Sequence, residues 1–160
     1  MGSAIESYGD YGRGEEILIE GSNFLRNRAK PAIVHEGYYS PLMILSSYFE
    51  DNEGAVQAHV NYSDATIQNS IFVNNTGQSE FVGVSLGGGA QESKTVQNSL
   101  FLESGSTDSE ESKVALRFAS ETKNRLYNSV FLETAGVQNQ SELIEIYYSF
   151  IDENRIEGSA

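Results

Sequence analysis

The sequence repeats one four-position motif six times, and each copy is centred on a serine. An aliphatic residue lies three positions before the serine, a large apolar residue two positions after it, and a small polar residue five positions after it. The six serines are Ser22, Ser47, Ser70, Ser99, Ser129 and Ser149. Successive serines are 20 to 30 residues apart, a period typical of solenoids, in which stacking of the repeats buries the core. This repeat therefore constrains the fold more than any local propensity does.

The spacing within the motif predicts a bent strand. In the third copy, Ile67 and Phe72 are five residues apart, so a flat strand would place one of them in solvent. A bend between Asn69 and Ser70 lets both side chains point inward. The small polar residue five after each serine is expected at the next corner. Asparagine there would tolerate a turn conformation, and stacked amides would hydrogen-bond from rung to rung.

A third apolar stretch follows the motif in most copies, at residues 32–34, 55–56, 81–84 and 114–116. Three short strands per turn predict an all-β fold, a single-stranded right-handed parallel β-helix of about six rungs. With a strand spacing of about 4.8 Å, the rod would be roughly 29 Å long. The aliphatic residues of the motif and its phenylalanines should form two internal ladders. The phenylalanines are Phe24, Phe49, Phe72, Phe101 and Phe131.

Three other architectures fit the repeat less well. A left-handed β-helix has a hexapeptide repeat, which would give far more regular spacing. A leucine-rich repeat needs an LxxLxL run, which no copy contains. A β-sandwich of short strands does not explain why all four motif positions stay in phase.

Two short motifs resemble those of a known group of proteins. Phe-x-x-Asn occurs at residues 24–27, 49–52 and 72–75, and small residues precede an aliphatic at 53–56, with a looser version at 88–90. These resemble the FxxN and GGA(I/L/V) repeats of polymorphic outer-membrane proteins and related β-helical surface adhesins. The resemblance covers roughly residues 16–155 and implies a β-helix that is extracellular or at the cell surface. The fourth and fifth copies depart from the pattern, with Ser104 and Thr134 in place of asparagine.

The chain of 160 residues predicts one domain. We expect the β-helix over residues 16–155, a tag remnant with a candidate cap over 1–15, and a tail over 156–160. A β-helix with uncovered ends exposes unpaired strand edges and apolar side chains. We therefore expect end-to-end self-association, unless the N-terminal segment with Tyr8 and Tyr11 folds across one opening.

Composition excludes several classes of function. The chain has 23 acidic and 10 basic residues, a net charge of −13, so its surface repels phosphate backbones and we expect no nucleic-acid partner. No apolar run approaches the roughly 18 residues of a membrane span, and none is expected. The absence of cysteine excludes disulfides, thiolate zinc sites and cysteine catalysis. It also fits a surface protein.

The acidic residues show no catalytic grouping. The five aspartates are scattered, and neither Arg117 nor Arg125 is marked as catalytic, so no catalytic residue is predicted. Glu103 and Glu133 occupy the same position in successive copies and should lie one strand spacing apart. They are the candidate metal ligands, for a weak Ca²⁺ site; the alternative is a solvated outward face. No other cofactor is expected.

Residues 35–39 form the candidate binding site. His35, Glu36, Tyr38 and Tyr39 combine a titratable ring, a carboxylate and two aromatics in what we expect to be a loop. Tyrosines on loops are common contacts for sugars and proteins. The alternative is a loop that packs over the rod. His59 is expected to be exposed structure, and the glycine-rich stretch 83–90, which lacks a phosphate-loop lysine, is expected to make a sharp turn.

The sequence therefore predicts a β-helical segment of a secreted or cell-surface protein. Its function would be adhesion or structural spacing without catalysis, and its partner a host or cell-surface protein or glycan. Two alternatives remain open: a fragment of a carbohydrate-active polysaccharide lyase or glycoside hydrolase, and a phage tail-fibre rod, which would form a trimer.

Overall fold

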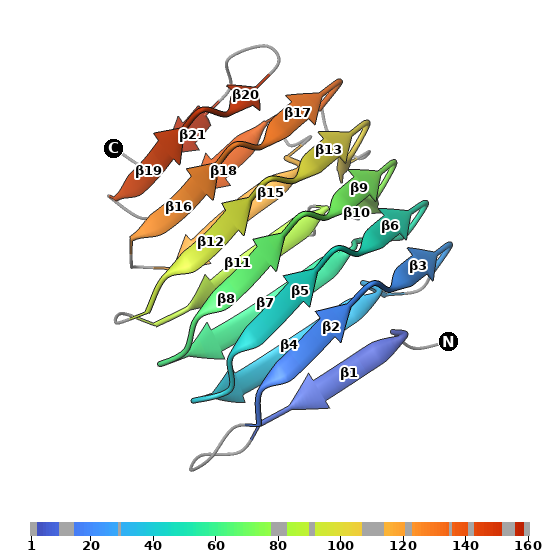
Figure 1. The fold of residues 1–160 in the computed structure, drawn as a ribbon. Helices are drawn as coiled ribbons and strands as arrows, with labels where there is room; N and C mark the ends of the chain where they lie inside the picture. The colour runs from blue at the N-terminus through green and yellow to red at the C-terminus, as the bar shows by residue number, and fades with distance from the viewer. Residues whose placement is uncertain are drawn as a thin grey trace.

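The computed structural model describes residues 3–9, 15–28, 30–77, 83–89, 92–106, 114–120, 123–134, 136–140, 143–151 and 156–158. These residues contain strands and no helix, and the strands form three parallel walls around a common core (Figure 1). Accordingly, no helix in this part of the chain could cross a membrane.

We call the walls A, B and C. Wall A contains β1 (Ile5–Tyr8), β4 (Ile33–Tyr38), β7 (Val56–Asn61), β11 (Val84–Gly88), β15 (Leu116–Ser120), β18 (Val137–Asn139) and β21 (Ile156–Gly158). Wall B contains β2 (Ile17–Glu20), β5 (Leu42–Leu45), β8 (Ala65–Gln68), β12 (Lys94–Gln97), β16 (Asn124–Tyr127) and β19 (Ile144–Tyr147). Wall C contains β3 (Asn23–Leu25), β6 (Tyr48–Glu50), β9 (Ile71–Val73), β13 (Leu100–Leu102), β17 (Val130–Leu132) and β20 (Phe150–Ile151). A short pair, β10 (Thr76–Gly77) and β14 (Gly105–Ser106), follows wall C in two rungs.

The chain visits the walls in the order A, B, C and is a right-handed coil. In Figure 1 it runs to the right along walls B and C in front, returns to the left along wall A behind, and rises from β1 to β21. Neighbouring rungs pair in parallel, and equivalent residues of successive motifs lie in register, as with Ile44, Ile67 and Val96. The predicted parallel β-helix of about six rungs is confirmed.

The predicted bend is made by the residue directly before each serine, whose backbone has the left-handed conformation. These residues are Gly21, Ser46, Asn69, Asn98, Asn128 and Tyr148, with φ between 45° and 56°. Each serine then satisfies the backbone at the bend. For example, the Ser70 hydroxyl donates to the Gln68 carbonyl (3.0 Å) and accepts from the Ser47 N–H (3.2 Å). The same rung-to-rung contact links all six serines.

The second corner differs from the prediction by one residue. After each of the first five serines, the residue with a left-handed backbone lies four positions on; these residues are Arg26, Asp51, Asn74, Glu103 and Glu133. The residue five after the serine instead points inward, as Asn52 and Asn75 do. The amide ladder itself is present, since the Asn52 Nδ2 donates to the Asn75 Oδ1 at 2.8 Å. The Asn75 Nδ2 also donates to the Phe49 carbonyl at 2.9 Å. A buried amide at this position satisfies corner carbonyls, but the turn falls one residue earlier also where Ser104 or Thr134 replaces the asparagine.

The five motif phenylalanines stack through the core. Their ring centroids are 4.8, 4.8, 4.7 and 4.5 Å apart, with planes within 10° of parallel. This separation equals the spacing of adjacent strands, so each ring lies directly on the next. All five side chains are buried, and the two predicted internal ladders are confirmed.

The solenoid extends beyond residues 16–155 at both ends. β1, within the segment expected to be a tag remnant or cap, pairs with β4, and β21 pairs with β18. The described part of the N-terminal segment therefore continues wall A instead of crossing the opening, and Tyr8 is exposed. Tyr11 lies outside the described residues. End-to-end association through the terminal rungs stays a prediction.

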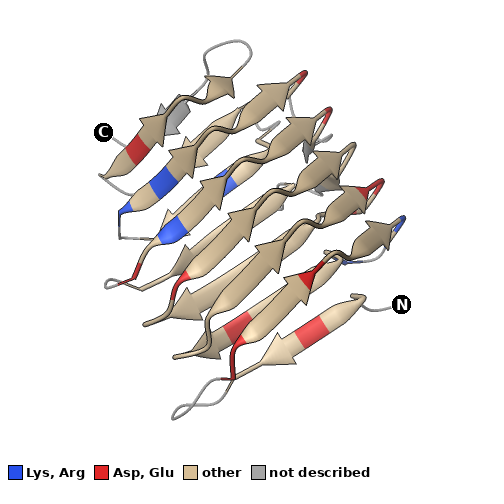
Figure 2. Ribbon diagram, viewed as in Figure 1, with Lys and Arg blue, Asp and Glu red and all other residues tan. Residues whose placement is uncertain are grey.

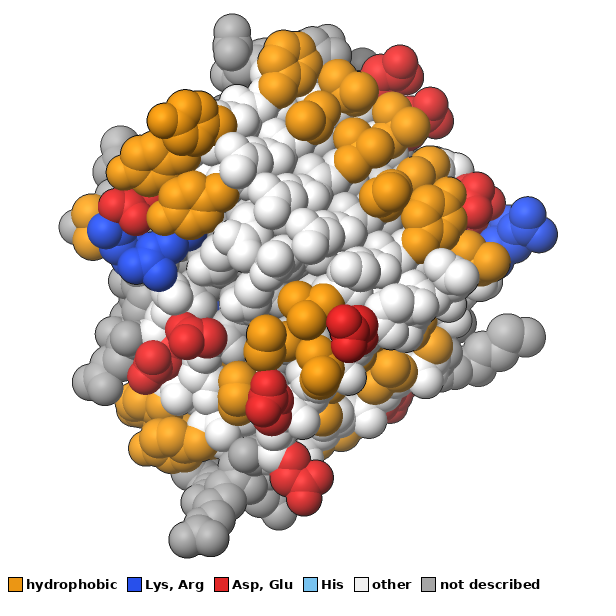
Figure 3. Space-filling model, viewed as in Figure 1, with side chains coloured by type: hydrophobic (Ala, Val, Ile, Leu, Met, Phe, Trp, Pro, Cys, Tyr) orange, Lys and Arg blue, Asp and Glu red, His pale blue; other side chains and the backbone are white. Residues whose placement is uncertain are grey.

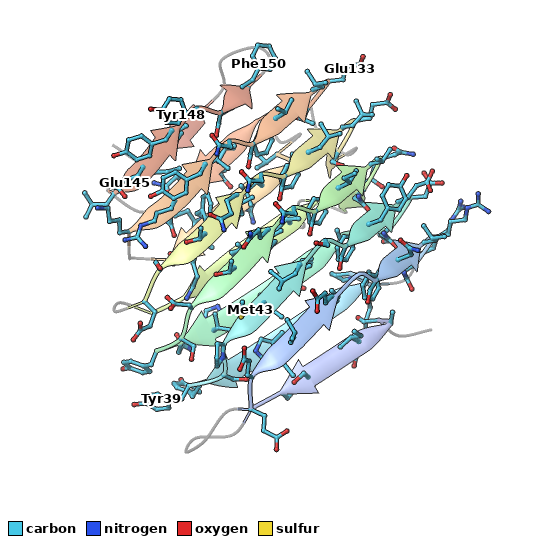
Figure 4. All side chains as sticks on the ribbon, viewed as in Figure 1. Tyr39, Met43, Glu133, Glu145, Tyr148 and Phe150 are labelled. Carbon is cyan, nitrogen blue, oxygen red and sulfur yellow. The ribbon has the colours of Figure 1, made fainter. Side chains whose placement is uncertain are left out.

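The phenylalanine stack gives a stability prediction. Replacing Phe72 with alanine should destabilise the fold by about 3–5 kcal/mol, because it leaves a cavity between two occupied rungs. Phe150→Ala is the matched control, since this side chain is 56% exposed on the outer face of wall C (Figure 4). Guanidinium unfolding should show a large midpoint shift for Phe72→Ala and a small one for Phe150→Ala. Equal shifts would contradict the stacked core.

Candidate functional site

The candidate binding residues 35–39 belong mostly to a strand, not to a loop. β4 alternates sides, so His35 faces the core while Glu36 faces solvent. The His35 Nε2 lies 3.0 Å from the Ser40 carbonyl. Since a carbonyl only accepts, Nε2 carries the proton and Nδ1, which has no partner among the described residues, is the acceptor. With 1% of its surface exposed, His35 is not accessible to a ligand.

Glu36 and Tyr38 lie instead on the outer face of wall A, at the corner where wall A turns into wall B. Strand register places Tyr8, Glu36 and His59 in one row across β1, β4 and β7. Tyr38 pairs with Asn61 in a second row. Adjacent strands thus bring residues from three separate parts of the sequence to one surface.

Two adjoining hollows lie on this surface. The first, of about 280 Å³, is lined by Tyr8, Gly9, Glu36, Gly37, Tyr38, His59 and Asn61. The second, of about 450 Å³, is lined by His59, Asn61, Gly88, Gly89, Ala119, Ser120 and Gln140. His59 and Asn61 are common to both, so the hollows adjoin at β7. We call them together the corner groove.

A cluster of tyrosines stands beside the groove. Tyr39 stacks on Tyr62 with ring centroids 5.3 Å apart, and Tyr38 lies 6.3 Å from Tyr62. Tyr39 and Tyr62 both have φ of 55° and are exposed. Figure 4 shows Tyr39 at the corner, pointing away from the rod. We call Tyr38, Tyr39 and Tyr62 the tyrosine ridge.

Glycines explain why the second hollow forms where it does. The register between β11 and β7 ends at Gly87 and His59. At the next residue, Gly88, φ is 138°, and a Cβ atom would lie 1.9 Å from the Val60 carbonyl oxygen. Only glycine permits this approach. The pairing of β11 with β7 therefore stops here, although β11 continues beside β15 to Gly88. Most of the stretch expected to make a sharp turn is thus a strand, and its lack of side chains hollows the surface.

A buried lysine occupies the space beneath this irregularity. Lys94 is the first residue of β12 and points inward, between Ala65 and Asn124 of the neighbouring rungs. Its Nζ donates to the carbonyls of Val60 (3.1 Å) and Ser63 (2.7 Å). These carbonyls lie where wall A departs from the ladder, so the ammonium replaces missing backbone donors. Burial lowers the pKa of Lys94 to about 8, an effect that Asp64 and Glu92 partly oppose.

Sequence reasoning missed Lys94, although a signal was present. The equivalent inward position of the other rungs is held by Ile17, Leu42, Ala65, Asn124 and Ile144. Asn124 is also part of a buried polar chain: it accepts from the Ser120 hydroxyl (2.7 Å) and donates to the Asn139 Oδ1 (2.8 Å). Polar residues thus replace aliphatic ones at this ladder position in two of the rungs that the groove crosses, those of β11 and β15.

The candidate metal ligands lie elsewhere, at the corner between walls C and A. Glu103 and Glu133 are exposed on neighbouring rungs, as the red positions at the ends of β13 and β17 show (Figure 2). Within the described residues there is no group of three or more histidine or acidic side chains that could hold a metal. Two carboxylates supply only part of the six to eight oxygens that Ca²⁺ takes. The weak Ca²⁺ site stays a prediction.

Wall C has an apolar outer face. Figure 3 shows hydrophobic side chains along this wall, whereas the centre of wall B is polar. The outward residues of wall C include Tyr48, Ile71, Val73, Leu100, Leu102, Val130 and Leu132. Most are half-buried by their neighbours across the strands.

The corner groove combines groups suited to a polar ligand. Among the described residues, the Glu36 carboxylate and the His59 imidazole have no side-chain partner, and no lysine or arginine lines either hollow. Comparison with protein-family models, curated proteins and solved structures finds no match. The function proposed below therefore rests on the geometry of the rod, the groove and the ridge alone.

The buried lysine gives a prediction for pH dependence. Between pH 8 and 10.5 the unfolded chain holds a proton that folded Lys94 has lost, so the free energy of unfolding should rise with pH, by roughly 3 kcal/mol at most. Lys94→Met should abolish this rise, whereas Lys123→Met, at an exposed ion pair with Glu145, should retain it. Guanidinium unfolding from pH 7 to about pH 10 measures the effect. At higher pH the raised pKa of Tyr48 would lower the free energy of unfolding and oppose the rise. An unchanged slope in Lys94→Met would contradict the assignment.

Proposed function

We propose that this chain is a β-helical segment of a secreted or cell-surface protein, acting in adhesion or as a structural spacer without catalysis. The serine ladder carries the proposal. Hydrogen bonds between serines join every rung to the next from Ser22 to Ser149, and the phenylalanines stack beneath them. Such a rod holds surface side chains at fixed spacing, which suits both a spacer and an adhesive surface.

The tyrosine ridge and corner groove favour adhesion. Exposed tyrosines provide large, rigid contact areas with a polar end, and they are enriched where proteins bind partners. Two of the three ridge tyrosines are more than two-fifths exposed, at 55% for Tyr39 and 43% for Tyr62. The partner we propose is a surface protein or glycan of another cell or host.

Adhesion can be tested with beads that display the chain. We expect the beads to resist detachment by flow from surfaces coated with mucin, extracellular-matrix protein or cell-wall polysaccharide. Replacing Tyr39 and Tyr62 with asparagine should reduce retained beads about tenfold, in line with the loss of exposed aromatic contacts. Asparagine tolerates the left-handed backbone at both positions.

Tyr148→Asn is the matched control. This tyrosine also has a left-handed backbone, with φ of 52°, and it is 92% exposed at the opposite end of the rod (Figure 4). Its replacement should leave adhesion unchanged. Equal losses from the two variants would contradict a specific role for the ridge, and retention no better than that of bare beads would leave only the spacer function.

Catalysis is tested in parallel. The chain should release neither reducing ends nor unsaturated products from a panel of polysaccharides, with or without Ca²⁺. Turnover that survives purification and disappears in Glu36→Gln would overturn the proposal in favour of a lyase or hydrolase. A stable trimer in light scattering would instead favour a tail-fibre rod.

A further inference from the structure

We propose that the corner groove binds a linear, uncharged oligosaccharide that lies along the axis of the rod. This inference rests on the proposed adhesive function and adds the class of ligand and the residues that contact it. Of the residues that line the groove, only Glu36, Gly37 and Tyr38 belong to the segment 35–39 that the sequence singled out.

The groove has the shape of a site for a chain molecule. It begins at Tyr8 on β1, crosses β4, β7, β11 and β15, and ends at Gln140, which directly follows β18. Five strand spacings of about 4.8 Å give a length of roughly 24 Å. Because the two hollows share His59 and Asn61, a ligand long enough to occupy both would contact these two residues at its middle.

The second hollow is deep because the glycines at its base have no side chains. Gly87 and Ala119 continue the outward row that begins with Tyr8, Glu36 and His59. A Cβ atom at Gly87 would lie 3.1 Å from the His59 Nδ1, and one at Gly89 would lie 3.1 Å from the Asn61 Oδ1. Without these atoms, a sugar ring can lie against the backbone between His59 and Gln140.

The polar groups of the groove match hydroxyl groups, which both donate and accept hydrogen bonds. Asn61 accepts from the Gly89 N–H through its Oδ1 at 2.7 Å. This contact fixes the amide and leaves its NH₂ group, which has no partner among the described residues, as a donor. Glu36 supplies an acceptor and His59 supplies one donor and one acceptor. Tyr8 and Tyr38 add aromatic faces at the other end, so the groove combines apolar and convergent polar groups.

Charge excludes an acidic glycan. Glu36 contributes a negative charge to the groove, the chain as a whole carries −13, and no lysine or arginine is among the described lining residues. Lys94 lies below the groove, where its ammonium donates to the Val60 and Ser63 carbonyls. A uronate or sulfate group in the groove would therefore meet repulsion, with no opposite charge among the lining residues that the structure describes.

Backbone pairing excludes a peptide bound as an added strand. That mode requires a free sheet edge, whereas the groove crosses the face of wall A, whose inner strands pair on both sides. Where the ladder is interrupted at Val60, Lys94 already occupies the free carbonyl. The ligand must therefore bind through side chains and carry its own hydrogen-bonding groups, as a saccharide does.

Calorimetric titration of the chain with defined sugars tests the inference. The probes are linear hexasaccharides of β-1,4-glucose, β-1,4-xylose, β-1,4-N-acetylglucosamine and α-1,4-glucose, together with hexagalacturonate as the charged comparison. We expect saturable binding of at least one neutral hexasaccharide. Its disaccharide and hexagalacturonate should bind at least tenfold more weakly, because the first covers only part of the groove and the second is repelled.

Variants locate the binding. Ala119→Tyr fills the second hollow from the outer face and should weaken binding at least tenfold, as should His59→Ala. Thr95→Tyr places the same side chain on the outer face of wall B and should not change affinity. Unfolding midpoints of the variants confirm that the fold is intact.

The outcomes separate the two proposals. Binding of no neutral hexasaccharide, or binding unaffected by Ala119→Tyr, would overturn the oligosaccharide site. If beads then still adhere to protein-coated surfaces and lose adhesion when Tyr39 and Tyr62 are replaced, adhesion stands with a protein partner. If neither sugar binding nor bead adhesion occurs, the adhesive function fails with the site.

Discussion

The whole solenoid depends on how the chain turns the corner before each serine. A left-handed backbone at a non-glycine residue is costly, and a bend also separates N–H groups from the carbonyls of the next rung. The serine hydroxyl resolves both problems, because it donates to the carbonyl two residues earlier and accepts an N–H from the neighbouring rung. The same hydroxyl thus fixes the local bend and joins the rungs. With the bend fixed, both the aliphatic residue and the phenylalanine of each motif face inward, and the core can stack.

Stacking also explains where the surface is free to vary. Each inward position contacts the same position one rung away, so phenylalanine rings, asparagine amides and serine hydroxyls form continuous ladders. Outward positions carry no such requirement. Wall A is the longest wall, with strands of up to six residues, and it has two outward rows near its corner with wall B. Glu36 and His59 lie in one of these rows, and Tyr38 and Asn61 lie in the other.

The ladders were predictable from sequence because they repeat, whereas the site was not, because it depends on exceptions to the repeat. The spacing around each serine predicts the strands, the bend and both apolar ladders. The same spacing predicts the second corner one residue too late. Asn74, which makes the turn, and Asn75, which is buried, are both asparagines, so residue type does not tell them apart. His35 was misjudged because residues 35–39 look polar and loop-like, although period-two alternation in β4 turns His35 inward. The contact of Lys94 with Val60 spans 34 residues, and no local pattern reports it.

Lys94 compensates for backbone hydrogen bonds that are missing beneath the groove. The glycines at 87–89 take the chain out of the ladder and leave carbonyls without backbone donors, and an unpaired buried carbonyl is expensive. A buried ammonium is itself expensive, and the other rungs hold this position with aliphatic, alanine or asparagine side chains. A sequence selected only for a stable rod would continue the ladder with an aliphatic residue here. The combination of a glycine break, a buried charge and adjoining surface hollows is what the proposed binding site would require of these rungs.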